Sequence, residues 1–147
     1  MQNKFNTVEN LILNFLQNDA DVSAQVKYFH QKLKPDPAKY NRDQLPALAV
    51  HAHSYQNDGF QKNITALVEI VNQGGDMATV DDKVKEIASL VIDKLNAQSA
   101  RSGYGATLGS DDVDDIQVTT ASVNPEPITS GFLGLGHINV QVTITER

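Results

Sequence analysis

The 147-residue sequence contains no cysteine. Without thiols the chain forms no disulfide, and both thiolate catalysis and cysteine-based zinc sites are excluded. A length within about 100 to 200 residues is usual for one domain, and a domain of this size buries enough surface to fold without a metal or covalent staple. We therefore expect a single domain spanning residues 1–147, matured in a reducing cytoplasm.

Long apolar runs and an excess of basic residues are also missing. No run of about 18 apolar residues occurs, and the first residues lack a basic region followed by an apolar stretch, so we expect no signal peptide and no membrane span. The net charge of −6 argues against a protein that coats nucleic acid, because phosphate neutralisation needs clustered Lys and Arg. The stretch 27–42 leans basic but is interrupted by Asp36, which favours a solvated surface.

Two amphipathic helices are predicted. Asn6 followed by Glu9 has the spacing of a capping box, and Thr79 to Asp82 has the same pattern at the start of the second helix. Asp81 and Asp82 would then face the positive end of the helix dipole, with Lys94 near the negative end. The apolar stripes, spaced by three and four residues, comprise Val8, Leu11, Ile12, Phe15 and Leu16 in the first helix and Val80, Val84, Ile87, Ala88, Val91 and Leu95 in the second.

Alternating apolar residues predict the strands. Residues 45–54 and 63–72 are expected to form a hairpin through the turn at 56–59, with Gly74 and Gly75 ending the second strand. Residues 22–33 favour a strand over a helix, and the two prolines of segment 34–37 indicate a loop. Further strands are predicted at 116–120 and 137–145.

Two segments are predicted to lack regular structure. Residues 99–115 are rich in Ser, Gly and Asp, which predicts a long mobile loop of the kind that is often functional. Residues 124–136 contain two prolines and three glycines and are expected to be an extended hairpin connection. There, Phe132, Leu133 and Leu135 either are displayed for docking or fold back onto the core.

These elements predict an α+β fold in which two main helices pack on one face of a four- to five-stranded, mixed and largely antiparallel sheet, with long extended loops. The opposite face would carry polar side chains suited to solvent or to a moderately polar protein interface. Its expected members in the last strand are Asn139, Gln141, Thr143 and Thr145.

No catalytic, cofactor-binding or metal-binding residues are predicted. His51 and His53 share a strand spacing that suits a metal, but no third ligand is fixed nearby, so a paired or exposed strand feature is favoured. The aspartates at 111–115 lack the pattern of an EF-hand, and the glycines at 131–136 precede a strand instead of a helix. Neither Ser102 nor Ser130 has a nucleophile context. We expect a protein that is not an enzyme.

The flexible segments supply the candidate interface residues. They are polar, acidic or apolar side chains in the predicted loop and at the predicted hairpin tip. The set comprises Arg101, Tyr104, Leu108, Asp111, Asp112, Asp114, Asp115, Phe132, Leu133 and Leu135.

The layout resembles that of the tail terminator, or tail completion, proteins of long-tailed bacteriophages. The resemblance covers nearly the whole chain and rests on the N-terminal helix, the proline-led strand from Leu45 to Val50, the helix from Val80 to Leu95 and the final strand from Ile138 to Ile144. It implies a homo-oligomeric ring, commonly a hexamer, that caps the head-proximal end of the tail tube and contacts the tail tube protein and the head connector. It also implies a virion location after assembly in the host cytoplasm.

Other interpretations remain open. Head-closure and tail-tube subunits share parts of this layout, and a small non-phage protein-binding domain would show similar patterning. The third class is an unrecognised enzyme or metal protein that uses His51 and His53. In a terminator, DNA would pass through the lumen without specific binding. We hypothesise that the aspartates at 111–115 keep that lumen acidic, so that DNA does not adhere.

Overall fold

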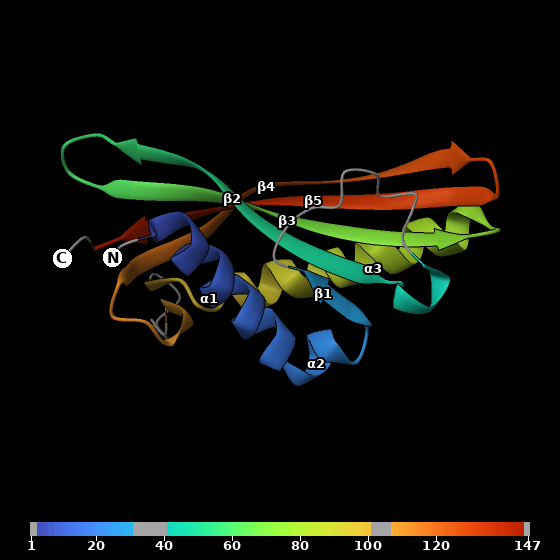
Figure 1. Cartoon of the computed structure of the whole chain (residues 1–147), viewed down its shortest axis with the longest axis horizontal. Coiled ribbons are helices and arrows are strands. Elements are labelled where there is room, and N and C mark those ends of the chain that lie inside the picture. The colour runs from blue at the N-terminus through green and yellow to red at the C-terminus, as the bar shows by residue number, and fades with distance from the viewer. Residues whose placement is uncertain (1–2, 31–40, 101–106, 146–147) are drawn as a thin grey trace.

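The computed structural model describes residues 3–30, 41–100 and 107–145 and is elongated along its sheet (Figure 1). The elements in chain order are α1 (Lys4–Asn18), α2 (Ala20–Ser23), β1 (Tyr28–His30), η2 (Arg42–Gln44), β2 (Ala47–Asn57), β3 (Lys62–Gly74), α3 (Met77–Asn96), η4 (Thr107–Gly109), β4 (Val113–Ile128) and β5 (Gly131–Ile144).

The five strands form one mixed sheet in the order β1-β2-β3-β5-β4. Only the short strand β1 runs parallel to its neighbour β2, and the remaining pairs are antiparallel. The predicted fold class, α+β with a largely antiparallel sheet, is confirmed.

The main core lies between the sheet and the two long helices, which cover the same sheet face (Figure 1). The alternating residues of β3 and β5 that were predicted to be buried do face this core. The stripe predicted for the second helix is also confirmed, because all six of its members are buried: Val80, Val84, Ile87, Ala88, Val91 and Leu95. Burial of these side chains is the main favourable contribution to folding.

Helix α1 begins one turn earlier than predicted. Asn3 is the N-cap, and its side-chain oxygen accepts a hydrogen bond from the backbone N–H of Asn6 at 3.0 Å. The capping box at Asn6 and Glu9 is therefore wrong. The helix is free to start upstream because asparagine at position 3 is an equally good cap, and this places Glu9 on the buried side of the helix.

Helix α3 also begins earlier than predicted, at Met77. Its N-cap is Asp76, whose carboxylate accepts hydrogen bonds from the backbone N–H and the hydroxyl of Thr79. Asp81 consequently lies in the second turn, where it pairs with Lys85 at 2.6 Å instead of facing the helix end. The position of Lys94 in the last turn is as predicted.

Residues 22–30 do not form the continuous strand that was predicted for 22–33, and residues 31–33 lie outside the described residues. The short helix α2 occupies its beginning, and the strand β1 covers only Tyr28–His30. Asp19 caps α2 through hydrogen bonds from the N–H groups of Asp21 and Val22, so a local cap overrides the weak strand pattern. The loop predicted at 34–37 lies outside the described residues.

The C-terminal region is more regular than predicted. Residues 124–136 were expected to form an extended connection, but β4 continues to Ile128 and β5 begins at Gly131, leaving Thr129 and Ser130 as the turn. Pro125 and Pro127 fit because β4 is an edge strand, where a missing N–H costs no ladder hydrogen bond. The loop predicted at 99–115 is likewise interrupted, by η4 and by the start of β4 at Val113.

The glycines of β5 allow close packing instead of flexibility. A Cβ atom on Gly134 would lie 2.8 Å from Val80 Cγ1 and 2.9 Å from Val84 Cγ2, so α3 sits directly on this strand. Gly131 adopts a φ of 139°, which side chains rarely adopt. Across the ranges that the structure covers, no helix combines the length and apolar character needed to cross a membrane.

Candidate interaction interface

The tip of the β2–β3 hairpin carries one fully exposed aromatic side chain. Phe60 is 97% exposed, far more than any other large hydrophobic residue in the described part of the chain. The hairpin extends past the helices, so its tip stands clear of α1 (Figure 1). A large apolar side chain held in water by the fold is a typical anchor for a protein contact.

Side-chain hydrogen bonds order this tip. Asp58 Oδ1 accepts from the N–H groups of Phe60 at 2.9 Å and Gln61 at 2.7 Å, while Asn57 Oδ1 accepts from the N–H of Gly59 at 2.9 Å. The backbone N–H groups of Gln61 and Phe60 lower the pKa of Asp58, because they stabilise its charged form. Gly59, at a φ of 90°, makes the reversal. The tip is therefore preorganised.

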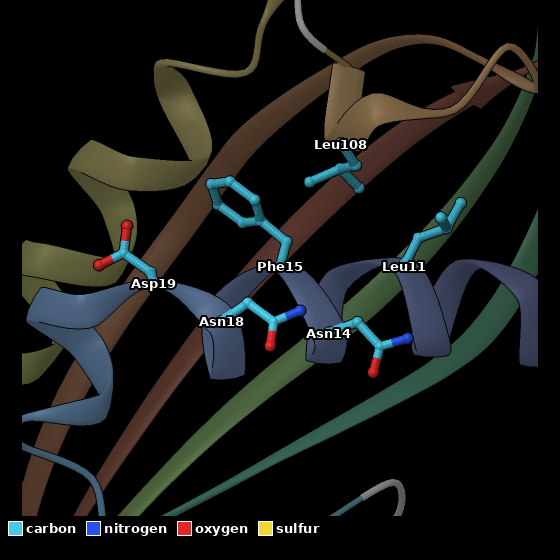
Figure 2. Close-up of a pocket in the computed structure, with 6 residues that line it drawn as sticks. All are labelled: Leu11, Asn14, Phe15, Asn18, Asp19 and Leu108. Carbon is cyan, nitrogen blue, oxygen red and sulfur yellow. The ribbon is translucent and has the colours of Figure 1, made fainter.

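A groove opens on the outer side of α1, with a volume of about 380 Å³. Figure 2 shows the apolar side chains of Leu11, Phe15 and Leu108 gathered around it, with the amides of Asn14 and Asn18 along the helix. Leu11 and Phe15 lie on the part of the predicted stripe that the sheet leaves half-exposed. The groove thus combines an apolar centre with a neutral polar margin.

The far wall of the groove is held by the end of α3. Leu108 belongs to η4, where its N–H donates to Gln98 Oε1 at 3.2 Å and the N–H of Thr107 donates to the Gln98 carbonyl at 3.1 Å. Leu108 has a φ of 59°, in the left-handed region. These bonds fix an unfavourable backbone conformation that turns an apolar side chain toward α1.

One end of the groove is charged, because two carboxylates share one lysine there. Lys94 Nζ lies 3.3 Å from Asp19 Oδ2 and 2.8 Å from Asp21 Oδ2. Desolvation raises the pKa of Asp19, but the hydrogen bonds from Val22, Lys94 and Asp21 outweigh it, and the pKa lies below its usual value. The pKa of Lys94 lies above its usual value, and its hydrogen bond to Asp21 is the largest cause.

Around the middle of β3 and β5, the sheet face opposite the helices is polar but contains a buried acid. Glu69 is 5% exposed, and its Oε2 atom lies 3.0 Å from His137 Nε2, whereas no hydrogen-bond partner of Oε1 is found in the described residues. Polar side chains of neighbouring strands also form hydrogen bonds on this face. For example, Thr143 Oγ1 donates to Asn63 Oδ1 at 2.8 Å. Burial of Glu69 was not predicted, since its outward strand position indicates solvent.

The two histidines considered as metal ligands lie next to each other. Their rings stack at 6.1 Å between centroids, and a register shift separates Ala52 from Ser54 at His53. His51 Nδ1 lies 3.4 Å from Glu9 Oε1. Among residues 3–30, 41–100 and 107–145, no group of three or more His, Asp or Glu side chains is arranged to hold a metal ion.

The acidic candidates occupy several environments. Asp115 accepts hydrogen bonds from the hydroxyl of Ser99 and the N–H of Ala100, so it holds the segment that follows α3. Asp114 accepts from the hydroxyl of Thr145. Asp111 is exposed and Asp112 half-buried just before β4. The four aspartates are therefore not one uniform patch.

The remaining candidates divide in a similar way. Leu108 lines the groove, whereas Arg101 and Tyr104 lie outside the described residues. Leu133 is buried in a second apolar cluster with Leu45, Ala47 and Val71, and Leu135 packs against it. Phe132 is half-buried. Of the two alternatives for this segment, folding back onto the core holds for Leu133, because alternate β5 residues face that cluster.

Sequence reasoning missed Phe60. The turn at 56–59 was identified, and the hairpin is confirmed, but the residue after the turn was not considered. An aromatic side chain directly after an Asn-Asp-Gly turn is a usable signal, because a hairpin tip offers no core into which such a side chain can pack.

Comparisons with known proteins reveal likeness in fold only. No family model and no curated protein sequence matches the chain. Among solved structures, it is similar to a chain of the "Virion of native gene transfer agent (GTA) particle", with a TM-score of 0.56 and 14% sequence identity over 94% of this chain and 95% of that chain. The shared fold extends over nearly the full length of both chains.

Proposed function

We propose that this chain is a structural subunit of a phage-like virion, and specifically a tail terminator that forms a ring at the head-proximal end of the tail tube. The observation that carries the proposal is the full-length fold likeness to a chain of a gene transfer agent virion, with a TM-score of 0.56. The sequence resemblance to tail terminators, which rests on element order, agrees with it. The proposed role is assembly and not catalysis.

The surfaces described above suit assembly of identical subunits. The hairpin tip and the groove are different patches of one molecule, so a contact between them is heterologous. Heterologous contacts close into a ring when the rotation per subunit divides a full turn, and otherwise they propagate as a filament. A terminator needs the closed outcome, whereas a tube subunit needs stacking into a longer polymer.

The expected partners follow from this position. One side of the ring would contact the tail tube protein and the other the head connector, while DNA passes through the lumen. The long free edge of β4 and the polar sheet face are additional surfaces for these contacts. Pro125 and Pro127 limit uncontrolled pairing along that edge.

Electron microscopy of the purified full-length protein tests the proposal. For the protein alone we expect closed rings. After it is mixed with isolated tail tubes, we expect added density at one end of each tube. Open filaments made by this chain alone would instead indicate a tube subunit. Particles that never form rings and never bind tubes would overturn the proposed function.

A genetic test addresses the terminator role itself. Deleting the gene in the particle-producing strain should give tails of uncontrolled length that are not attached to heads, because nothing stops tube growth. Complementation with the wild-type chain should restore uniform tails. Tails of normal length in the deletion strain would contradict the role.

A further inference from the structure

We propose that Phe60 at the β2–β3 hairpin tip of one copy inserts into the α1 groove lined by Leu11, Phe15 and Leu108 of the next copy. The occupant of the groove is thus a second copy of this chain. The inference deepens the proposed ring by naming its subunit contact, and it rests on that proposal only for closure of the ring.

The two surfaces match in size and polarity. A cavity of about 150 Å³ holds a benzene ring, and the groove, at about 380 Å³, has room for a phenyl side chain and part of its hairpin. The centre of the groove is apolar. At its margin, the amides of Asn14 and Asn18 present donors and acceptors to the backbone groups of an incoming turn (Figure 2).

The charged groups of the groove lie at one end of it. The tip carries the exposed carboxylate of Asp58, and Asp19 at that end of the groove pairs with Lys94, which Asp21 shares, so this end keeps one net negative charge. The amide margin is neutral. An acidic tip therefore meets no unpaired acid among the residues that line the groove, and the amide N–H groups supply donors to it.

The fold makes the contact intermolecular. The hairpin points away from the helices (Figure 1), and the 97% exposure of Phe60 shows that it is not packed against its own chain. Hydrogen bonds at Asp58 and Asn57 hold the tip in shape before binding. A preorganised anchor loses little conformational entropy on docking, which favours association.

Cysteine cross-linking provides a direct test, because the natural chain has no cysteine. Gln61→Cys places a thiol beside Phe60, and Asn14→Cys places one at the groove margin. The two single variants, one carrying a tag, are mixed at high concentration and oxidised. We expect a disulfide-linked heterodimer that is resolved by mass on a non-reducing gel.

Two controls give the test its specificity. Gln61→Cys mixed with Met77→Cys, at the exposed start of α3 at the other end of the molecule (Figure 1), should cross-link far less. Adding Phe60→Ala to the Gln61→Cys chain should remove most of the heterodimer, with an unchanged melting temperature. Loss of the buried phenyl group should weaken self-association roughly 10- to 100-fold.

The outcomes separate this contact from the proposed function. Cross-linking of Gln61→Cys with Asn14→Cys no stronger than with Met77→Cys overturns the contact, even if rings are seen by electron microscopy. Specific cross-linking that Phe60→Ala abolishes supports it, even if the assemblies are open filaments and the terminator role fails. A groove variant, Leu108→Asn, should reduce cross-linking as Phe60→Ala does, and asparagine tolerates the left-handed backbone at that position.

Discussion

The carboxylate of Glu9 in α1 accepts a hydrogen bond from the backbone N–H of Ala52 in β2 at 2.9 Å, and this bond is buried. Strand β1 pairs only with the beginning of β2, from Ala47 to Ala49. In the part of the chain that the structure describes, no strand pairs with the outer edge of β2 beyond that point, and Glu9 satisfies one of its N–H groups. The helix thereby both covers the core and closes part of an exposed sheet edge.

Replacing Glu9 with Ala should lower the free energy of unfolding by about 1 to 3 kcal/mol, because the buried N–H of Ala52 loses its acceptor. Urea unfolding at neutral pH measures the change. Glu86→Ala is the matched control, an exposed glutamate on α3, and should change stability little. Equal effects of the two substitutions would show that the bond contributes nothing specific.

Gly134→Ala should destabilise the protein by about 1 to 3 kcal/mol through overpacking. The added methyl group would lie within 3 Å of two valine side chains of α3, Val80 and Val84. Gly75→Ala is the control, since its Cβ would meet nothing within 4 Å. A Gly134→Ala protein as stable as the wild type would mean that α3 shifts away from β5 without cost.

Acid should weaken the attachment of α2 to α3. Because the folded-state pKa of Asp19 lies below its ordinary value of 3.8, its contribution to stability is present above that value and is lost as the pH falls through the folded pKa. Asp19→Asn keeps a capping residue but removes the charge. Its urea midpoint should therefore fall less between pH 5 and pH 2 than that of the wild type, over a range of roughly three pH units.

Asp58 and Asp76 also have lowered pKa values, owing to the hydrogen bonds from Gln61 and Phe60 in one case and from Thr79 in the other. Both carboxylates remain in Asp19→Asn, so part of the acid sensitivity should persist. An acid profile of Asp19→Asn that superimposes on the wild-type profile would contradict the role of the Asp19–Lys94 pair.

The acidic-lumen hypothesis can be tested at the two aspartates outside β4. Substituting Asp111 and Asp112 with Asn should slow genome passage if these residues face the lumen, because less negative charge repels DNA. Asp114 and Asp115 are left intact, since both accept structural hydrogen bonds. Infectivity at the wild-type level would remove support for the hypothesis.

Periodicity predicted the α3 stripe residue by residue, because one buried face over many turns leaves an unambiguous pattern. It also identified the β2–β3 hairpin and the fold class. Helix starts were less predictable. Asn3 and Asp76 cap as well as the residues selected downstream, so local chemistry offered two equivalent starts and the packing of the following turn decided between them.

The β4–β5 ribbon was hidden by residues that usually interrupt strands. Pro125 and Pro127 are tolerated because β4 is an edge, and Gly134 is required because α3 passes close above it. Both reasons depend on tertiary neighbours, which a local pattern does not contain. The same holds for Glu9, whose acceptor role depends on a strand 43 positions away in the sequence, and for Phe60, whose exposure depends on how far the hairpin extends.

The mass of the protein in solution, measured by light scattering over a range of concentrations, decides whether this chain assembles into a closed ring. We expect a closed oligomer of the 16.1 kDa chain, with a hexamer as the expected ring and Phe60→Ala shifting the mass toward the monomer. A wild-type chain that stays monomeric at every concentration, with and without tail tubes present, would contradict it.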